Sequence, residues 1–131
     1  MREFRQKIDI RFADIDAYHH VNNAVYFTYM EHTRTQVMLD YFLKHTAEGI
    51  QFVVSEATCR YLRPIRLEDE LEVIAKFLIK GKVRFEIEFS FVTPDNSFLY
   101  AKGKTTMACV SRESGKPQRI PPSLNEMLEL R

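Results

Sequence analysis

Hydrophobic and polar residues alternate over several short stretches of the chain, which is the pattern of β-strands with one buried face. The first stretch runs from Phe4 to Phe12. Four more stretches, rich in β-branched and aromatic residues, follow Gly49 and are separated by turn-forming residues. The sequence therefore predicts strands at residues 4–12, 51–62, 70–79, 83–91 and 98–110, and a short C-terminal helix that starts at Ser123.

A different period appears between Ala24 and about Lys44, where neither Gly nor Pro occurs. Apolar residues recur there every three or four positions, as on one face of a helix. The face comprises Tyr26, Tyr29, Met30, Thr33, Val37, Met38, Tyr41 and Phe42. A helix of this length is on the order of 30 Å long and can cross a small domain. Asn22 and Asn23, which precede it, are good N-cap residues, so we expect a central helix that begins there.

The order of one strand, a long helix and four strands predicts a single α+β domain over residues 1–131. Tight turns between the later strands indicate that the sheet is mostly antiparallel, with about five strands. One helix covers only one face of such a sheet. We therefore expect a homo-oligomer, in which a second copy buries the remaining surface.

Composition and charge narrow the class of protein. Of the 131 residues, 45% are hydrophobic, and 19 basic side chains against 18 acidic ones leave a formal charge of +1. No field of that size attracts nucleic acid or an anionic membrane. The first residues carry no apolar signal segment, and no stretch is long enough for a membrane helix, so we expect a cytoplasmic protein. Cys59 and Cys109 are too few for a disulfide scaffold and are expected to be reduced thiols inside strands.

Chemistry-bearing residues concentrate in the polar loop from Arg11 to Asn23, directly before the long helix. The loop contains two carboxylates, two histidines and two amides: Asp14, Asp16, His19, His20, Asn22 and Asn23. A helix start offers unpaired N–H groups that stabilise an oxyanion, and an ionised carboxylate beside it attacks a carbonyl or activates a water. In the alternative interpretation, the aspartates cap turns and the histidines are surface groups. A metal site is disfavoured because the histidines and carboxylates lack a metal-ligand spacing.

Within this region, Asp16-Ala17-Tyr18-His19-His20-Val21-Asn22-Asn23, followed by Tyr26 and Tyr29-Met30-Glu31-His32-Thr33-Arg34, resembles a known signature. It is similar to D-x-x-G-H-V-N-N-x-x-Y-x-x-Y-F-E-x-A-R of the hotdog-fold acyl-CoA thioesterases of the 4-hydroxybenzoyl-CoA thioesterase type. Two later blocks also resemble that family, in the same order: Tyr61-Leu62-Arg63-Pro64 with Glu70-Leu71-Glu72-Val73, and Gly115-Lys116-Pro117 with Ile120-Pro121.

The resemblance implies a hotdog fold, which is a long central helix wrapped by an antiparallel sheet, assembled as a dimer or a dimer of dimers (a homotetramer). It also implies hydrolysis of acyl-CoA or acyl carrier protein thioesters without a cofactor. Coenzyme A is then part of the substrate. By position, Asp16 matches the catalytic carboxylate, as nucleophile or general base, and the backbone N–H of Asn23 matches the group that polarises the thioester carbonyl. The substrate-binding positions implied are Tyr18, His19, His20, Asn22, Tyr26, Tyr61, Arg63 and Pro64. His19 replaces the family's glycine, and histidine tolerates positive φ better than most residues.

Other candidates remain open. Glu31 is an alternative catalytic carboxylate, although a structural ion pair with Arg34, three residues further on, is the favoured interpretation. Basic residues that are candidates for the coenzyme A phosphates, or ordinary surface charges, are Arg60, Arg63, Arg66, Lys80, Lys82 and Arg84. A non-catalytic acyl-CoA-binding or sensor module and a hotdog enoyl-CoA hydratase or dehydratase are the alternative functions.

Overall fold

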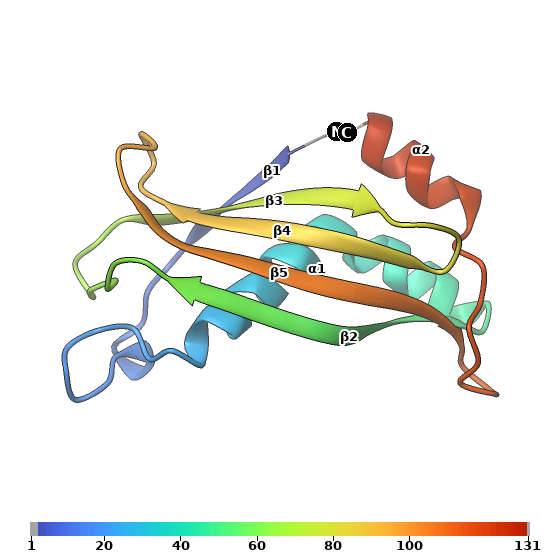
Figure 1. Ribbon diagram of the computed structural model, residues 1–131, viewed down its shortest axis with the longest axis horizontal. Helices are drawn as coiled ribbons and strands as arrows, with labels where there is room; N and C mark the ends of the chain where they lie inside the picture. Colours follow the sequence, from blue (N-terminus) through green and yellow to red (C-terminus); the bar gives the residue numbers. More distant parts are fainter. Residues whose placement is uncertain (1–2, 131) are drawn as a thin grey trace.

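Five antiparallel strands and one long helix make up most of the computed structural model, which describes residues 3–130. The strand order is β1-β3-β4-β5-β2, and every neighbouring pair is antiparallel (Figure 1). The predicted α+β fold is confirmed. In chain order the elements are β1 (Glu3–Ile8), the 3-10 turn η1 (Phe12–Asp14), α1 (Val25–Ala47), β2 (Ile50–Tyr61), β3 (Leu71–Ile79), β4 (Arg84–Val92), β5 (Leu99–Ser111) and α2 (Pro122–Leu130).

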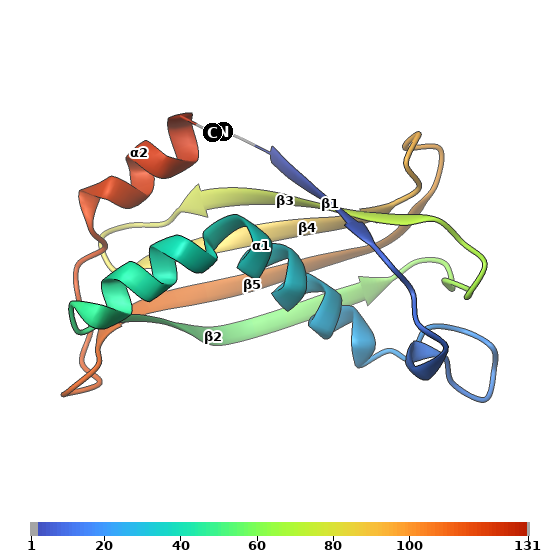
Figure 2. The same cartoon turned by 180° about the vertical axis from the view of Figure 1, so that it is seen from behind.

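The helix α1 lies along one face of the sheet, as Figure 2 shows from the helix side. Alternate residues of the central strands point towards it and are fully buried, among them Val73, Phe89 and Met107. Gly103 of β5 is also on this face, and a Cβ there would collide with the sulfur of Met30. The missing side chain at Gly103 therefore allows α1 to approach the middle of the sheet.

The first strand is shorter than its sequence pattern predicts. Among the described residues β1 pairs with β3 from Glu3 to Ile8, and the pairing ends there because β3 begins at Leu71, the partner of Ile8. The alternation up to Phe12 is therefore not a strand, and Phe12 lies on η1 with 82% of its surface exposed. Alternation of hydrophobic and polar residues produces a strand only where a neighbouring strand supplies backbone hydrogen-bond partners.

The ends of α1 also differ from the prediction. The N-cap residue is Ala24, and the side chain of Asn22 accepts a hydrogen bond from the Ala24 N–H at 2.9 Å. Asn22 therefore orders the turn before the helix. The helix continues to Ala47, and Gly49, at φ +84°, then reverses the chain into β2.

β2 is an edge strand of the sheet, and within residues 3–130 it pairs with β5 alone. Most of its residues are exposed, including Val53 (40%) and Val54 (47%). An edge of this length with apolar side chains is a template for pairing with another chain.

Among residues 3–130, no helix is both long and apolar enough to cross a bilayer. Cys59 on β2 and Cys109 on β5 are unpaired, as predicted. Burial raises the pKa of each thiol to about 11, so both stay protonated at neutral pH and are poor nucleophiles.

Candidate active site

Asp14 anchors the loop that precedes α1. Its buried carboxylate accepts hydrogen bonds from the Arg11 N–H (3.0 Å), from the Arg11 guanidinium (2.9 and 3.2 Å) and from the Tyr29 hydroxyl (2.6 Å). Tyr29 lies one turn inside the helix. The carboxylate thus fixes the start of the loop to the helix that follows it.

Ionisation of Asp14 follows from these contacts. Burial alone would raise its pKa, but the hydrogen bonds from Arg11 and Tyr29 outweigh burial, and the pKa lies below its ordinary value. The pKa of Tyr29 is raised by burial and by its bond to Asp14, so its hydroxyl remains a donor. Asp14 is therefore a charged structural group whose oxygens are already engaged.

Asp16 occupies a different environment. It is half-buried and lines a cavity of 390 Å³ beside the start of α1. One oxygen, Oδ1, accepts the N–H of Tyr18 (2.9 Å) and more weakly that of His20 (3.4 Å), whereas Oδ2 has no partner among the described residues. The loop therefore holds the Asp16 side chain by one oxygen and leaves the other free.

A tight turn brings Asp16 back towards the helix. The His19 N–H donates to the Asp16 carbonyl (3.0 Å), and the Asp16 N–H donates to the His20 carbonyl (2.9 Å). His19 adopts φ +65°, the conformation expected where the related sequences have glycine. Val21 then joins the loop to the segment after β2 through a 2.7 Å bond to the Ile65 carbonyl.

Asn23 presents an unpaired backbone donor at the helix start. Its N–H has no acceptor within residues 3–130, while its carbonyl accepts the Tyr61 hydroxyl at 2.8 Å. Tyr61 packs edge-on against Tyr26, with ring centroids 4.8 Å apart. Burial raises the pKa of Tyr26 to about 12, so that phenol stays protonated. Tyr61 thus fixes the orientation of a peptide whose N–H is available to a ligand.

The structure brings together most of the predicted site residues. The cavity is lined by the predicted Asp16, Tyr18, His20, Asn23, Tyr26, Tyr61, Arg63 and Pro64, together with Val21 and Leu62. His19 and Asn22 do not line it, since one forms the turn and the other orders the residues before α1. Val21 and Leu62 were missed, although both lie inside the blocks that pointed to the site.

Glu31 does not line the cavity. Its side chain is 69% exposed, and a carboxylate oxygen lies 3.8 Å from the Arg34 guanidinium, so the ion pair considered from the sequence is present. The Arg34 side chain is only 13% exposed, and its Nε lacks a hydrogen-bond partner among the described residues. Within the described chain, no group of three or more His, Cys, Asp or Glu side chains is placed to hold a metal ion.

The arrangement suits attack on an activated carbonyl. A carboxylate with a free oxygen and an unpaired N–H at a helix start face one cavity. Negative charge that develops on a carbonyl oxygen is stabilised by such an N–H and by the positive end of the helix.

Comparison with known proteins places this site in a family. The profile of the Thioesterase-like superfamily matches residues 10–128. The chain is 29% identical over 126 residues to the long-chain acyl-CoA thioesterase FadM of Escherichia coli, covering 94% of this chain and 95% of FadM. It is also 29% identical over 130 residues to the chloroplastic acyl-acyl carrier protein thioesterase ATL3 of Arabidopsis thaliana, covering 95% of this chain and 67% of ATL3.

Among solved structures, Slr0204, a 1,4-dihydroxy-2-naphthoyl-CoA thioesterase from Synechocystis, superposes with a TM-score of 0.88 at 14% identity. The match covers 97% of this chain and 96% of Slr0204. At that identity the likeness concerns the fold, and it confirms the hotdog architecture that the motifs implied. By its sequence from residue 10 to residue 128 and by its fold, the chain belongs to the Thioesterase-like superfamily.

Proposed function

We propose that this protein hydrolyses acyl-CoA or acyl carrier protein thioesters to a free acid and a thiol, with Asp16 as nucleophile or general base. The observation that carries the proposal is that Asp16 and the unpaired N–H of Asn23 line the same cavity. Membership of the Thioesterase-like superfamily and the activities named for FadM and ATL3 support thioester hydrolysis.

In the general-base route, Asp16 Oδ2 takes a proton from a water whose oxygen bonds to the thioester carbon. The carbonyl π pair moves to the oxygen, which the Asn23 N–H stabilises. The carbon–sulfur bond then breaks, and protonated Asp16 returns the proton to the departing thiolate. No step requires a metal or an organic cofactor, because a thioester is already an activated acyl group.

In the nucleophilic route, Asp16 itself bonds to the thioester carbon and expels the thiolate, which leaves a mixed anhydride. Water then hydrolyses the anhydride to the acid and the regenerated carboxylate. A single turnover in ¹⁸O-labelled water, followed by mass spectrometry of the peptide that contains Asp16, tests this route: ¹⁸O in Asp16 establishes the anhydride, because the label enters the side chain only when water attacks the Asp16 carbonyl of that intermediate.

Substrate orientation follows from the cavity lining. Tyr26, Val21 and Leu62 provide apolar surface between the helix and the end of β2 for the acyl group. Arg63 and Pro64, both exposed, line the same cavity, and the pantetheine arm would leave past them. Tyr18 is 80% exposed at the same opening and is available to contact the arm.

We also propose that the protein assembles as a homodimer through β2, and that two dimers form a tetramer. The unpaired edge of β2 and the exposed Val53 and Val54 support pairing with a second copy. Analytical ultracentrifugation tests this: the wild type is expected to sediment as a dimer or tetramer, and Val54→Lys as a smaller species. A wild-type monomer at micromolar concentration contradicts the assembly.

A cytoplasmic location is proposed on the two unpaired cysteines, which are typical of a reducing compartment. Fractionation of cells that produce the tagged protein tests it, and recovery in the membrane or secreted fraction contradicts it.

The activity test is release of thiol from a panel of acyl-CoA and acyl carrier protein thioesters, followed with a thiol-reactive dye. The wild type is expected to turn over at least one of them, and Asp16→Asn to lose about 100-fold to 10,000-fold in kcat. Glu31→Gln is the matched control, since it neutralises a carboxylate outside the cavity. Binding without thiol release indicates an acyl-CoA-binding module instead, and hydration of enoyl-CoA without thiol release indicates a hydratase.

A further inference from the structure

One aromatic side chain bounds the inner end of the Asp16 cavity. Tyr26 lines the cavity, although only 2% of its surface is exposed. Its ring packs edge-on against Tyr61, with ring centroids 4.8 Å apart, and its centroid lies 5.3 Å from that of Phe91 on β4. Tyr26 therefore separates the cavity from the interior between α1 and the sheet.

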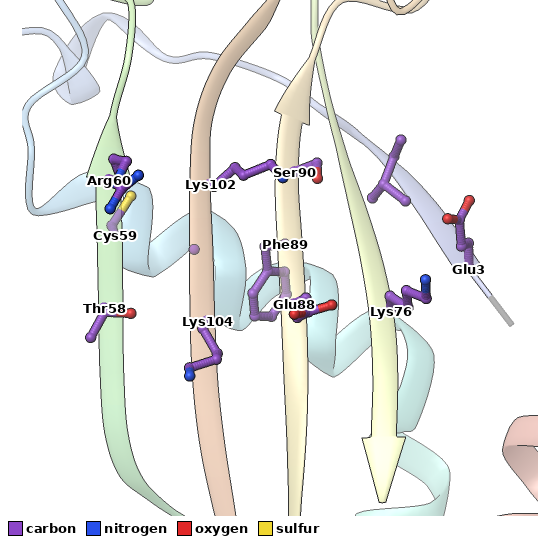
Figure 3. A pocket seen from close by; sticks show the side chains of 12 residues that line it. Glu3, Thr58, Cys59, Arg60, Lys76, Glu88, Phe89, Ser90, Lys102 and Lys104 are labelled. Atoms are coloured by element: carbon purple, nitrogen blue, oxygen red, sulfur yellow. The ribbon is translucent and has the colours of Figure 1, made fainter. Parts of the chain in front are cut away.

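Two successive rows of residues on the helix-facing side of the sheet lead inward from the cavity. The first row, which Tyr26 contacts, runs across β2, β5 and β4 and comprises Tyr61, Ala101 and Phe91. The second row, two residues further along each strand, comprises Cys59, Gly103 and Phe89. Figure 3 views these strands from the opposite face of the sheet, with α1 behind them. Burial and, to a smaller extent, the nearby Cys59 thiol raise the pKa of Tyr26, so the second row begins beside the phenol.

Met30 fills the space above the second row. It lies one turn after Tyr26 on the same face of α1, and only 1% of its surface is exposed. Gly103 has no side chain, and a Cβ there would lie against the sulfur and the terminal methyl group of Met30. The end of the Met30 side chain therefore occupies the place that a side chain at position 103 would take.

The interior around Met30 is closely packed. Phe89 and Ala101, on the strands beneath it, are fully buried. Extra atoms forced into a packed core displace side chains from their preferred conformations and cost free energy. An acyl chain that continues past Tyr26 therefore has to move Met30 away from Gly103, whereas a chain that ends at Tyr26 leaves the core unchanged.

We propose that Met30 sets the maximum length of the acyl chain, and that the substrates are thioesters of short acyl groups such as butyryl and hexanoyl. This inference rests on the proposed thioester hydrolysis at Asp16. A short chain packs against Tyr26 and stops before the second row. A longer chain displaces Met30 or leaves its end in water, and either outcome weakens its binding in the transition state relative to a chain that fits.

Chain-length profiles of kcat/KM test the assignment, measured by thiol release from acyl-CoA thioesters that range from acetyl to palmitoyl. The wild type is expected to be most efficient with butyryl-CoA or hexanoyl-CoA and at least about tenfold less efficient with lauroyl-CoA. The profile compares substrates on one protein sample, so its maximum does not depend on the fraction of a variant that is folded.

Three variants give opposed expectations. Met30→Ala removes the atoms that cover Gly103 and is expected to move the maximum to longer chains. Gly103→Ala places a methyl group against Met30, which pushes that side chain towards Tyr26, and is expected to move the maximum to shorter chains. Met38→Ala is the matched control, because it removes the same atoms from a fully buried position two turns further along α1, and it is expected to leave the maximum unchanged.

Three results overturn the proposal. The first is a wild type that hydrolyses lauroyl-CoA and palmitoyl-CoA as efficiently as hexanoyl-CoA, which indicates that the chain leaves the cavity by another route. The second is a maximum that Met30→Ala does not move. The third is an equal movement in Met38→Ala, which indicates a general loosening of the core.

Calorimetric binding separates this inference from the proposed activity. It uses hexanoyl-CoA and lauroyl-CoA with Asp16→Asn, which is expected not to consume them, and with the double variant Asp16→Asn/Met30→Ala. Met30→Ala is expected to strengthen lauroyl-CoA binding relative to hexanoyl-CoA about tenfold, the effect of roughly two buried methylene groups. That result supports the length limit even if the wild type hydrolyses no thioester. An active wild type with the same relative binding in both variants refutes the length limit alone.

Discussion

Two aspartates lie two residues apart in the loop before α1, and the structure predicts opposite consequences for their substitution by asparagine. Asp14 accepts bonds on both oxygens, from Arg11 and from Tyr29. Asp16 accepts loop N–H groups on Oδ1 only. Asparagine supplies one acceptor oxygen, so it reproduces the contacts of Asp16 but not those of Asp14.

The size of the Asp14 effect follows from the bonds that are lost. The substitution Asp14→Asn places an NH₂ group where the Tyr29 hydroxyl and the Arg11 N–H now donate. Hydrogen bonds to charged groups contribute roughly 1.5–3 kcal/mol each and are not additive, so we expect a loss of about 3 kcal/mol. Loss of the ion pair with the exposed Arg11 side chain adds little to this loss of folding free energy. For a chain of this length, that loss lowers the melting temperature by about 10 °C.

Thermal melts and thiol-release assays on the two variants check the reasoning. Asp14→Asn is expected to melt about 10 °C lower and to keep at least roughly a tenth of its activity when assayed well below its melting temperature. Asp16→Asn is expected to melt as the wild type does and to lose at least about 100-fold in kcat. Asp9→Asn, at an exposed position shortly before the loop, is the control for simple loss of a negative charge.

The opposite pattern refutes the assignment. If Asp14→Asn is inactive at an unchanged melting temperature and Asp16→Asn is active, then Asp14 performs the chemistry. If both variants melt as the wild type does, the hydrogen bonds at Asp14 contribute nothing measurable and the anchoring role is wrong.

Three further predictions concern the same region. Tyr61→Phe removes the hydrogen bond to the Asn23 carbonyl (2.8 Å) and is expected to lower kcat about tenfold with little change in KM. An unchanged kcat would mean that the Asn23 peptide is held in place without the Tyr61 hydroxyl. Because the pKa of Asp14 is lowered on folding, its contribution to the free energy of unfolding is complete above about pH 5 and is lost as the pH falls below about 4. Urea melts of the wild type from pH 7 to pH 3 should show this loss of stability. An identical decline in Asp14→Asn contradicts the prediction. Arg34→Met is expected to leave the free energy of unfolding unchanged or to raise it by roughly 1–2 kcal/mol, because the buried guanidinium has an unpaired Nε and, in the described part of the chain, a single acidic partner, Glu31 at 3.8 Å. A loss of more than about 2 kcal/mol in urea melts refutes this.

The limits of the helices and strands with a clear hydrophobic periodicity were predicted to within a few residues. β3, β4 and β5 begin and end within one residue of their predicted limits, because alternation and turn residues act locally. The apolar face of α1 was likewise predicted, apart from Arg34 and His45, two polar residues that are largely buried. The limits of β1 were not predictable, since whether Phe12 continues the strand depends on where a partner distant in sequence begins.

The candidate site and the roles of Asp16 and Asn23 were predicted through the motifs, whereas the contacts that hold the site were not. Sequence spacing alone does not distinguish Asp14 from Asp16, and the contact that engages Asp14, the bond from Tyr29 one turn inside the helix, is visible only in the structure. The tie between Tyr61 and the Asn23 carbonyl joins residues 38 positions apart. Such contacts are set by tertiary packing, which a local pattern does not encode.

Tyr61 is the last residue of the edge strand and also the residue that holds the Asn23 peptide. In the proposed dimer, a partner strand that steadies the end of β2 also steadies the amide that receives the carbonyl oxygen, so association and ligand binding would be thermodynamically linked. Linkage is reciprocal, so a ligand that orders this amide strengthens association along β2 by the same factor. A single phenol hydroxyl is the physical connection between the two.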